Sequence, residues 1–143
     1  MTPKSLVGTW SLVDFTITYA DGRPPLSPLG GAAEGLLLYA ADGHVSAVLS
    51  SAQRPLMGTG SLEREGTPPG GYVSYAGRWR LEGDTVQHTV LMSLVPDVVG
   101  QTLSRRARLQ AGLLELTYQR TPASGVTRTY CLSWRRPGGC DGH

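Results

Sequence analysis

The stretch "YVSYAGRWRLEGDTVQHTVLMSL", residues 72–94, contains two segments with alternating side chains, joined by the link "LEGD". In each segment every second residue shares one face: Val73, Tyr75, Gly77, Trp79 and Leu81 in the first, and Val86, His88, Val90, Met92 and Leu94 in the second. A period of two predicts strands with one buried face. A glycine in a short polar link is typical of a tight hairpin. The stretch therefore predicts two antiparallel strands.

The same pattern recurs along the chain. Nineteen glycines and ten prolines separate short runs rich in Val, Leu, Thr, Tyr and Trp, and no run keeps a helical period over three turns. This pattern is typical of an all-β domain. Eight strands are predicted, at 7–19, 35–40, 44–50, 72–81, 85–94, 101–109, 113–120 and 127–136.

The links between these runs favour an up-and-down order. "AADG" and "QAG", like "LEGD", are short and contain glycine, as tight hairpins require. Residues 21–34 and 50–71 form longer links, which are expected to lie at a mouth. Eight sequential antiparallel strands can close into a barrel that holds one small ligand. A seven- or eight-stranded sandwich is the alternative, without the Cys–Trp–Cys spacing of immunoglobulin domains.

Length and composition limit the classes of protein further. The 143 residues fit one domain, 1–143, with a barrel over about 6–136 and a flexible tail over 137–143. The net charge is +2 and the basic residues are scattered, with only Arg105, Arg106 and Arg108 close together. A nucleic-acid-binding protein would need a broader basic stripe, so this class is excluded. No run is long enough to insert into a membrane.

The N-terminus and the cysteines indicate the compartment. "MTPKSLVGTW" contains no long apolar segment of the kind found in signal peptides, so a cytoplasmic location is predicted. Cys131 and Cys140 are expected to be free thiols in that compartment, and a bridge between them would require export. A homodimer is kept as an alternative to a monomer.

Motifs for cofactors and metals are missing from the sequence. It contains no GxGxxG, no GxxxxGK[ST] and no GxSxG motif. His44, His88 and His143 lie far apart and form no metal-binding pattern. The sequence therefore predicts no cofactor and no metal.

His88 is the first candidate for chemistry, because it is the one polar side chain on the apolar face of its strand. Loss of water would lower the pKa of an imidazole in such a place below its reference of about 6.5. The neutral ring could act as a general base, a general acid or a ligand anchor. Alternatively, it is a core histidine paired with a neighbouring hydroxyl or carbonyl.

Arg105 is the second candidate, because it shares a face with Leu103, Ala107 and Leu109. A buried guanidinium stays charged and needs an anion or several acceptors. Its partner is either Asp14, if the first strand keeps its register, or a ligand carboxylate, enolate or enol. Asp14 points inward in that register, whereas a β-bulge in the first strand would turn it outward.

Other residues could line the inside of the barrel. The hydroxyls of Tyr39, Tyr75 and Tyr118 either bind a ligand carbonyl or belong to side chains that only fill space. Val90 and Met92 share the face of His88 and would contact an apolar ligand. Arg54 lies beside the longer link and either reaches the mouth or is exposed.

Several segments resemble a known family. "LVGTWSLV" is similar to the Gly-x-Trp signature of lipocalins, here Gly8 and Trp10, and "YCLSWRR" contains Trp134 and Arg136. "GLLLYAADGHVSAVL", "YVSYAGRW" and "VQHTVLMSLVPDVVGQTLSR" resemble the bacterial and fungal lipocalin-like-domain family. The similarity covers about residues 6–136. The sequence departs from the family pattern at Trp79 and in the link before Tyr72.

The resemblance implies an eight-stranded barrel that holds a small, largely apolar molecule. It also implies that Arg136 packs across Trp10 and closes one barrel end, a structural role. Related barrels are carriers, and similar cytoplasmic barrels are isomerases and cyclases of natural-product pathways. Two hypotheses follow: a cofactor-free cyclase or isomerase that uses His88, Arg105 and Tyr39, and a non-catalytic carrier.

A third hypothesis is a structural barrel whose inside is filled by side chains. The long Pro/Gly links weigh against it, because a filled barrel needs no movable mouth.

Overall fold

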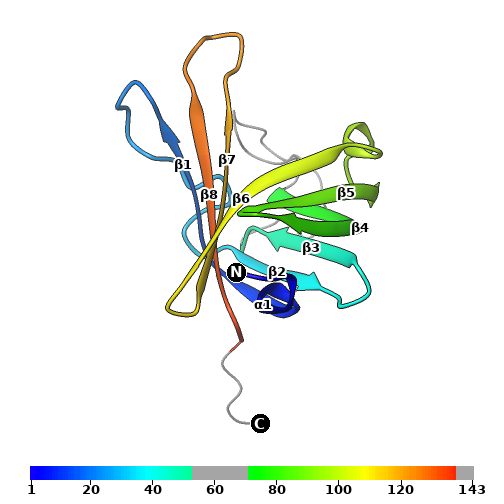
Figure 1. Ribbon diagram of the computed structural model, residues 1–143. Coiled ribbons are helices and arrows are strands. Elements are labelled where there is room, and N and C mark those ends of the chain that lie inside the picture. Colours follow the sequence, from blue (N-terminus) through cyan, green and yellow to red (C-terminus); the bar gives the residue numbers. More distant parts are fainter. Residues whose placement is uncertain (53–70, 138–143) are drawn as a thin grey trace.

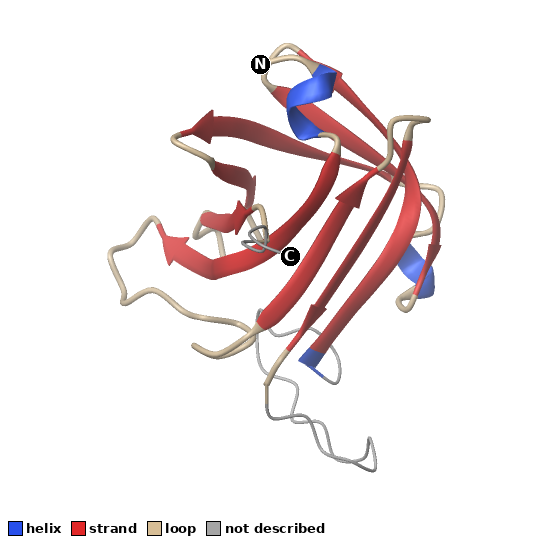
Figure 2. Cartoon of the chain, turned by 90° about the horizontal axis from the view of Figure 1, so that it is seen from below, coloured by secondary structure: helices blue, strands red, loops and turns tan. Residues whose placement is uncertain are grey.

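The structure is a computed structural model that describes residues 1–52 and 71–137 (Figure 1). Strands make up most of this part of the chain, as Figure 2 shows. The strands are β1 (Gly8–Tyr19), β2 (Glu34–Tyr39), β3 (His44–Ser50), β4 (Tyr72–Glu82), β5 (Thr85–Ser93), β6 (Thr102–Gln110), β7 (Leu113–Arg120) and β8 (Arg128–Arg135). Two short helices accompany them, α1 (Pro3–Leu6) and the 3₁₀ turn η2 (Pro96–Val98).

The strands form one closed antiparallel barrel in chain order, with β8 paired to β1. The predicted barrel is confirmed, and the sandwich alternative is wrong. Every predicted strand end agrees with the structure to within one residue. The short helix α1 has no counterpart in the predicted elements. Its four residues include a proline in the first turn and are too few for a period to emerge.

The two ends of the barrel differ. The tight turns after β2, β4 and β6 lie at one end, which we call the base, together with α1 (Figure 1). The links after β1, β5 and β7 lie at the other end, which we call the mouth. The longer links after β1, β5 and β7 thus lie around the mouth of the barrel.

A contact between the two ends of the chain closes the base. The guanidinium of Arg136 lies 4.1 Å from the centre of the Trp10 ring and donates hydrogen bonds to the carbonyls of Ser5 and Val7, each 2.9 Å long. The Trp10 indole N–H donates to the Leu6 carbonyl. This cation–π stack is the arrangement that the resemblance implied, and its place in the base gives it a structural role.

Two β-bulges change which residues face inward. In β1 the register with β8 passes from Leu12 to Asp14, so Val13 is an extra residue. Asp14 is consequently exposed, and Phe15 and Ile17 are buried in its place. The hypothesis of an Asp14–Arg105 pair inside the barrel is therefore wrong, and the bulge alternative is confirmed.

The second bulge lies in β5, where the register with β4 passes from Val90 to Met92 and leaves Leu91 as the extra residue. Val86, His88 and Val90 are buried, as the alternation predicts. Beyond the bulge the faces exchange, and Met92 is 64% exposed and Leu94 54% exposed. The prediction that both residues share the inner face with His88 is wrong, because period two does not continue through an inserted residue.

Gly77 makes the second bulge sterically feasible. A Cβ atom built on Gly77 would collide with the carbonyl oxygen of Thr89. Only a residue without a side chain lets β4 approach β5 this closely.

Two further findings concern the described residues alone. None of their helices is long and apolar enough to cross a membrane. Cys131 in β8 is a half-buried free thiol, whereas Cys140 lies outside the described residues.

Candidate functional site

A cavity of about 700 Å³ occupies the barrel and extends to the link after β7, at the mouth. Its apolar wall comes from β1, β2, β3, β4, β7 and β8: Phe15, Leu37, Ala47, Leu49, Val73, Leu116, Leu132 and Trp134. Its polar and aromatic wall contains Tyr75, His88, Arg105, Tyr118, Arg120, Thr121, Arg128 and Tyr130. Such a volume holds a drug-sized molecule, and apolar walls with a few polar groups are typical of ligand sites. The described barrel is thus not filled by its own side chains.

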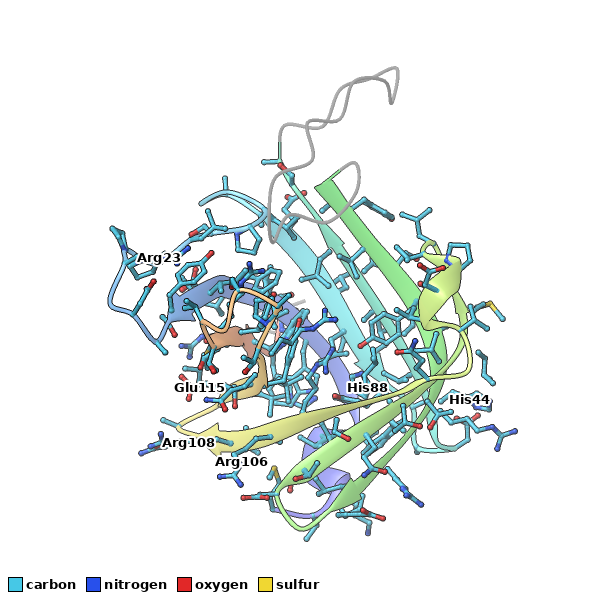
Figure 3. The ribbon with its side chains drawn as sticks, turned by 90° about the horizontal axis from the view of Figure 1, so that it is seen from above. Arg23, His44, His88, Arg106, Arg108 and Glu115 are labelled. Atoms are coloured by element: carbon cyan, nitrogen blue, oxygen red, sulfur yellow. The ribbon has the colours of Figure 1, made fainter. Side chains whose placement is uncertain are left out.

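His88 lies between two tyrosines in this wall. Its side chain points into the barrel from β5 (Figure 3) and is 1% exposed. The Tyr39 hydroxyl from β2 lies 2.7 Å from His88 Nε2, and the Tyr75 hydroxyl from β4 lies 2.6 Å from Nδ1. Phenol groups from β2 and from β4 therefore occupy both ring nitrogens of His88.

The proton positions in this triad follow from hydrogen-bond satisfaction. A neutral imidazole donates from one nitrogen and accepts at the other. Tyr39 is fully buried, and no other partner for its hydroxyl is found among the described residues. If Nε2 donated to Tyr39, the phenol proton would be stranded at a cost of about 1–3 kcal/mol. Tyr39 therefore donates to Nε2, and Nδ1–H donates to Tyr75.

This arrangement leaves one proton unused, the hydroxyl proton of Tyr75. Tyr75 lines the cavity, whereas Tyr39 does not. The triad Tyr39–His88–Tyr75 thus orients a hydrogen-bond donor toward the inside of the barrel. A ligand carbonyl or carboxylate is the natural acceptor.

Burial sets the charge state of the triad. It lowers the pKa of His88 to about 3, and the positive charge of Arg105 acts in the same direction. Burial also raises the pKa of Tyr75 to about 12, although Arg105 opposes this shift. The pKa of Tyr39 lies well above its usual value for the same main reason. All three groups are therefore neutral near pH 7.

Arg105 lies in the same cavity wall, on β6. Its guanidinium carbon is 3.7 Å from the centre of the Tyr118 ring, and Nη1 donates to the Ser104 carbonyl at 3.2 Å. No carboxylate contacts it among the described residues. Stacking on Tyr118 fixes the guanidinium plane and leaves further N–H groups at its edge.

An aromatic and basic wall continues from Arg105 toward the mouth. Tyr118 stacks on Tyr130 with ring centres 4.6 Å apart. Arg120 and Arg128 lie directly opposite each other on β7 and β8, and both line the cavity. Sequence reasoning missed Tyr130, Arg120 and Arg128 as site residues, although their parity along the strands places them on the inner face.

The remaining candidates divide into three groups. Tyr39 and Val90 are buried but do not line the cavity. Met92 and Asp14 lie on the outside of the barrel. Arg54 lies outside the described residues. The structure therefore brings His88, Tyr75, Tyr118 and Arg105 together and removes Met92 and Asp14 from the site.

The indole N–H of Trp134 is buried without an acceptor among the described residues. Within residues 1–52 and 71–137, no three His, Cys, Asp or Glu side chains are grouped so that they could hold a metal ion.

The geometry agrees with the comparison with known protein families. The lipocalin-like domain family matches residues 7–137, which include all eight strands. No curated protein matches the chain. A lipocalin-like barrel with an open cavity suggests the binding of a hydrophobic ligand. The chain belongs to the lipocalin-like domain family.

Proposed function

We propose that the protein binds a small, largely apolar organic molecule inside the barrel and that the Tyr75 hydroxyl donates a hydrogen bond to an oxygen atom of this molecule. The observation that carries the proposal is the Tyr39–His88–Tyr75 triad, of which His88 and Tyr75 line a cavity of about 700 Å³. The triad would hold the ligand in one orientation, while the apolar wall would contribute most of the affinity.

As an enzyme, the protein would catalyse a cofactor-free cyclisation or isomerisation, a reaction type found in secondary-metabolite pathways. The cavity would fold the substrate into a reactive conformer. Tyr75 would share its proton with a substrate oxygen and take it back, so that no net proton is consumed. His88 and Tyr39 would support this exchange by polarising Tyr75, and Arg105 would stabilise negative charge that develops on the same oxygen.

A non-catalytic carrier is the second candidate, and the state of His88 favours it. An imidazole with a pKa of about 3 is a poor general base near neutral pH, and both of its nitrogens are already hydrogen-bonded. A carrier needs only the anchor that Tyr75 provides. The cytoplasmic location and the homodimer stay predictions from the sequence.

Recovery of the natural ligand tests the proposal. Native mass spectrometry of the protein purified from its own host would identify a co-purifying small molecule. That molecule is then incubated with the wild-type protein and with Tyr75→Phe, and the products are separated by liquid chromatography, because isomers share one mass.

Three outcomes distinguish the candidates. A new isomer that forms at least tenfold more slowly with Tyr75→Phe would support the enzyme. Unchanged ligand that binds less tightly to Tyr75→Phe would support the carrier. A Phe variant that equals the wild type in affinity and turnover would contradict the role of Tyr75 in both.

A further inference from the structure

The charge of the cavity wall indicates what kind of ligand it holds. Three arginines line the cavity, Arg105, Arg120 and Arg128, and no Asp or Glu lines it within residues 1–52 and 71–137. Elsewhere on the barrel, Arg23, Arg80 and Arg106 each lie within 4.0 Å of a carboxylate oxygen, as the three ion pairs with Asp21, Glu82 and Asp84 show. The charged side chains of the described cavity wall are thus all positive, in a chain whose positive and negative charges are nearly balanced.

Arg105 is the cation placed to bind a charged group. The described structure gives it two contacts, the Tyr118 ring face and the Ser104 carbonyl, and neither neutralises its charge. A guanidinium has five N–H donors, and the contact with Ser104 uses one of them. Stacking keeps the rest in a plane whose geometry matches the two oxygens of a carboxylate.

Tyr75 is the neighbouring donor. Its hydroxyl proton is left unused by the triad and faces the same cavity. Arg105 acts electrostatically on Tyr75, Tyr118 and His88, so these groups form one cluster. His88 and the two tyrosines are neutral, and therefore they do not compete for the guanidinium.

We propose that the ligand is an organic anion, an apolar body with one carboxylate that binds the edge of Arg105 and accepts a hydrogen bond from Tyr75. This inference rests on the proposed binding function and specifies the class of its ligand. One carboxylate matches the single guanidinium of Arg105, whose described contacts are the Tyr118 ring and the Ser104 carbonyl. The Tyr118–Tyr130 stack would face the apolar body.

Two probes of equal size and different charge test the inference. Isothermal titration calorimetry at pH 7.5 would compare 2-naphthoate with its neutral counterpart 2-naphthamide. We expect the wild-type protein to bind naphthoate at least tenfold more tightly. In Arg105→Gln the preference should fall to within twofold, while the affinity for naphthamide stays within twofold of the wild type.

Two variants serve as controls. Arg108 lies on the same strand but is exposed and points outward (Figure 3), so Arg108→Gln should keep the tenfold preference. Arg105→Lys keeps the charge but lacks the planar fork, and it should keep part of the preference. Thermal melting of each variant confirms that it is folded.

Each contrary result has its own meaning. Equal binding of the two probes by the wild-type protein would overturn the inference and leave the binding function standing. Absence of binding for both probes would overturn the binding function as well. A preference that survives in Arg105→Gln but disappears in Arg120→Gln would overturn the assignment to Arg105 and move the anion to the mouth.

Discussion

His88 and His44 show how position decides what the same side chain does. His44 is exposed at the start of β3, and its Nδ1 lies 3.0 Å from an oxygen of Asp42. His88 has two phenols as partners and no carboxylate within the described residues. A buried imidazole with neutral partners gains nothing from a proton, because the charged form would lose its water without compensation.

This neutrality predicts a pH dependence of stability. The pKa of His88 is about 3 in the folded state and about 6.5 in the unfolded chain, so between these values the unfolded chain binds the extra proton. Stability is therefore complete above pH 6.5 and falls as the pH drops. Between pH 6.5 and 4.5 the loss should reach about 2–3 kcal/mol.

Urea unfolding of the wild type and of His88→Gln across this range measures the effect. The upper part of the range avoids the carboxylates Asp21 and Asp42, whose pKa values are lowered by Arg23 and His44 and which titrate at lower pH. Glutamine cannot be protonated, so the difference in unfolding free energy between the two proteins should shrink by the same amount. If the unfolding free energies of the two proteins changed in parallel with pH, this result would contradict a buried neutral His88.

At the scale of elements, the two bulges have one feature in common, because each leaves two consecutive residues exposed. These are Val13 and Asp14 in β1, and Leu91 and Met92 in β5. The β1 bulge could be considered from the sequence, because a carboxylate on an apolar face signals a conflict. The β5 bulge could not be predicted from the sequence, because Leu91 and Met92 are both apolar and suit either register.

The same contrast explains how far the sequence predicts this protein. Alternation and glycine links were enough for the strands, since these depend on local periods. They left a sandwich open as the alternative to a barrel, and the resemblance to the lipocalin-like-domain family favoured the barrel. The inward position of His88 and Arg105 also followed from the alternation of side chains along their strands. Their partners did not, because Tyr39 and Tyr75 reach His88 through a closed barrel whose register only the three-dimensional structure reveals.

Gly77 ties the β5 bulge to the stability of the barrel. In Gly77→Ala the new methyl group would collide with the Thr89 carbonyl, so β4 and β5 would have to separate. We expect a loss of about 2–4 kcal/mol in the free energy of unfolding. Gly31→Ala is the matched control, because nothing lies within 4 Å of its added Cβ, and it should change stability by less than about 0.5 kcal/mol. Equal chemical denaturation midpoints for the two variants would refute the role of Gly77.

The turn between β6 and β7 offers a stabilising change. Ala111 has φ of 53° and Gly112 has φ of 81°, as in a type I′ hairpin turn. Ala111 is the one residue other than glycine with positive φ in the described chain. Asparagine tolerates this conformation better than alanine, so Ala111→Asn should raise stability by about 0.5–1 kcal/mol. Differential scanning calorimetry would show a higher Tm, whereas a lower Tm would contradict the turn assignment.

The whole molecule separates stability from binding along the barrel axis. The base is tied by Arg136, which joins the C-terminal end of the barrel to the N-terminal segment. The cavity opens at the other end, where Arg120 and the link after β7 line it. Arginines therefore serve two purposes in one chain. At the base, Arg136 bonds with backbone carbonyls and contacts an indole ring, whereas Arg105 stacks on Tyr118 in the wall of the cavity.

Arg136→Gln tests this separation. The substitution removes two hydrogen bonds to the carbonyls of Ser5 and Val7 and the contact with Trp10, and it should lower the free energy of unfolding by about 1–2 kcal/mol. Arg135→Gln is the matched control, since Arg135 is exposed beside it, and its effect should stay within about 0.5 kcal/mol. Both variants should bind 2-naphthoate within twofold of the wild type, because neither residue lines the cavity. Weaker binding by Arg136→Gln, at a pH and temperature where that variant is fully folded, would show that the base controls the cavity and that the two ends are coupled.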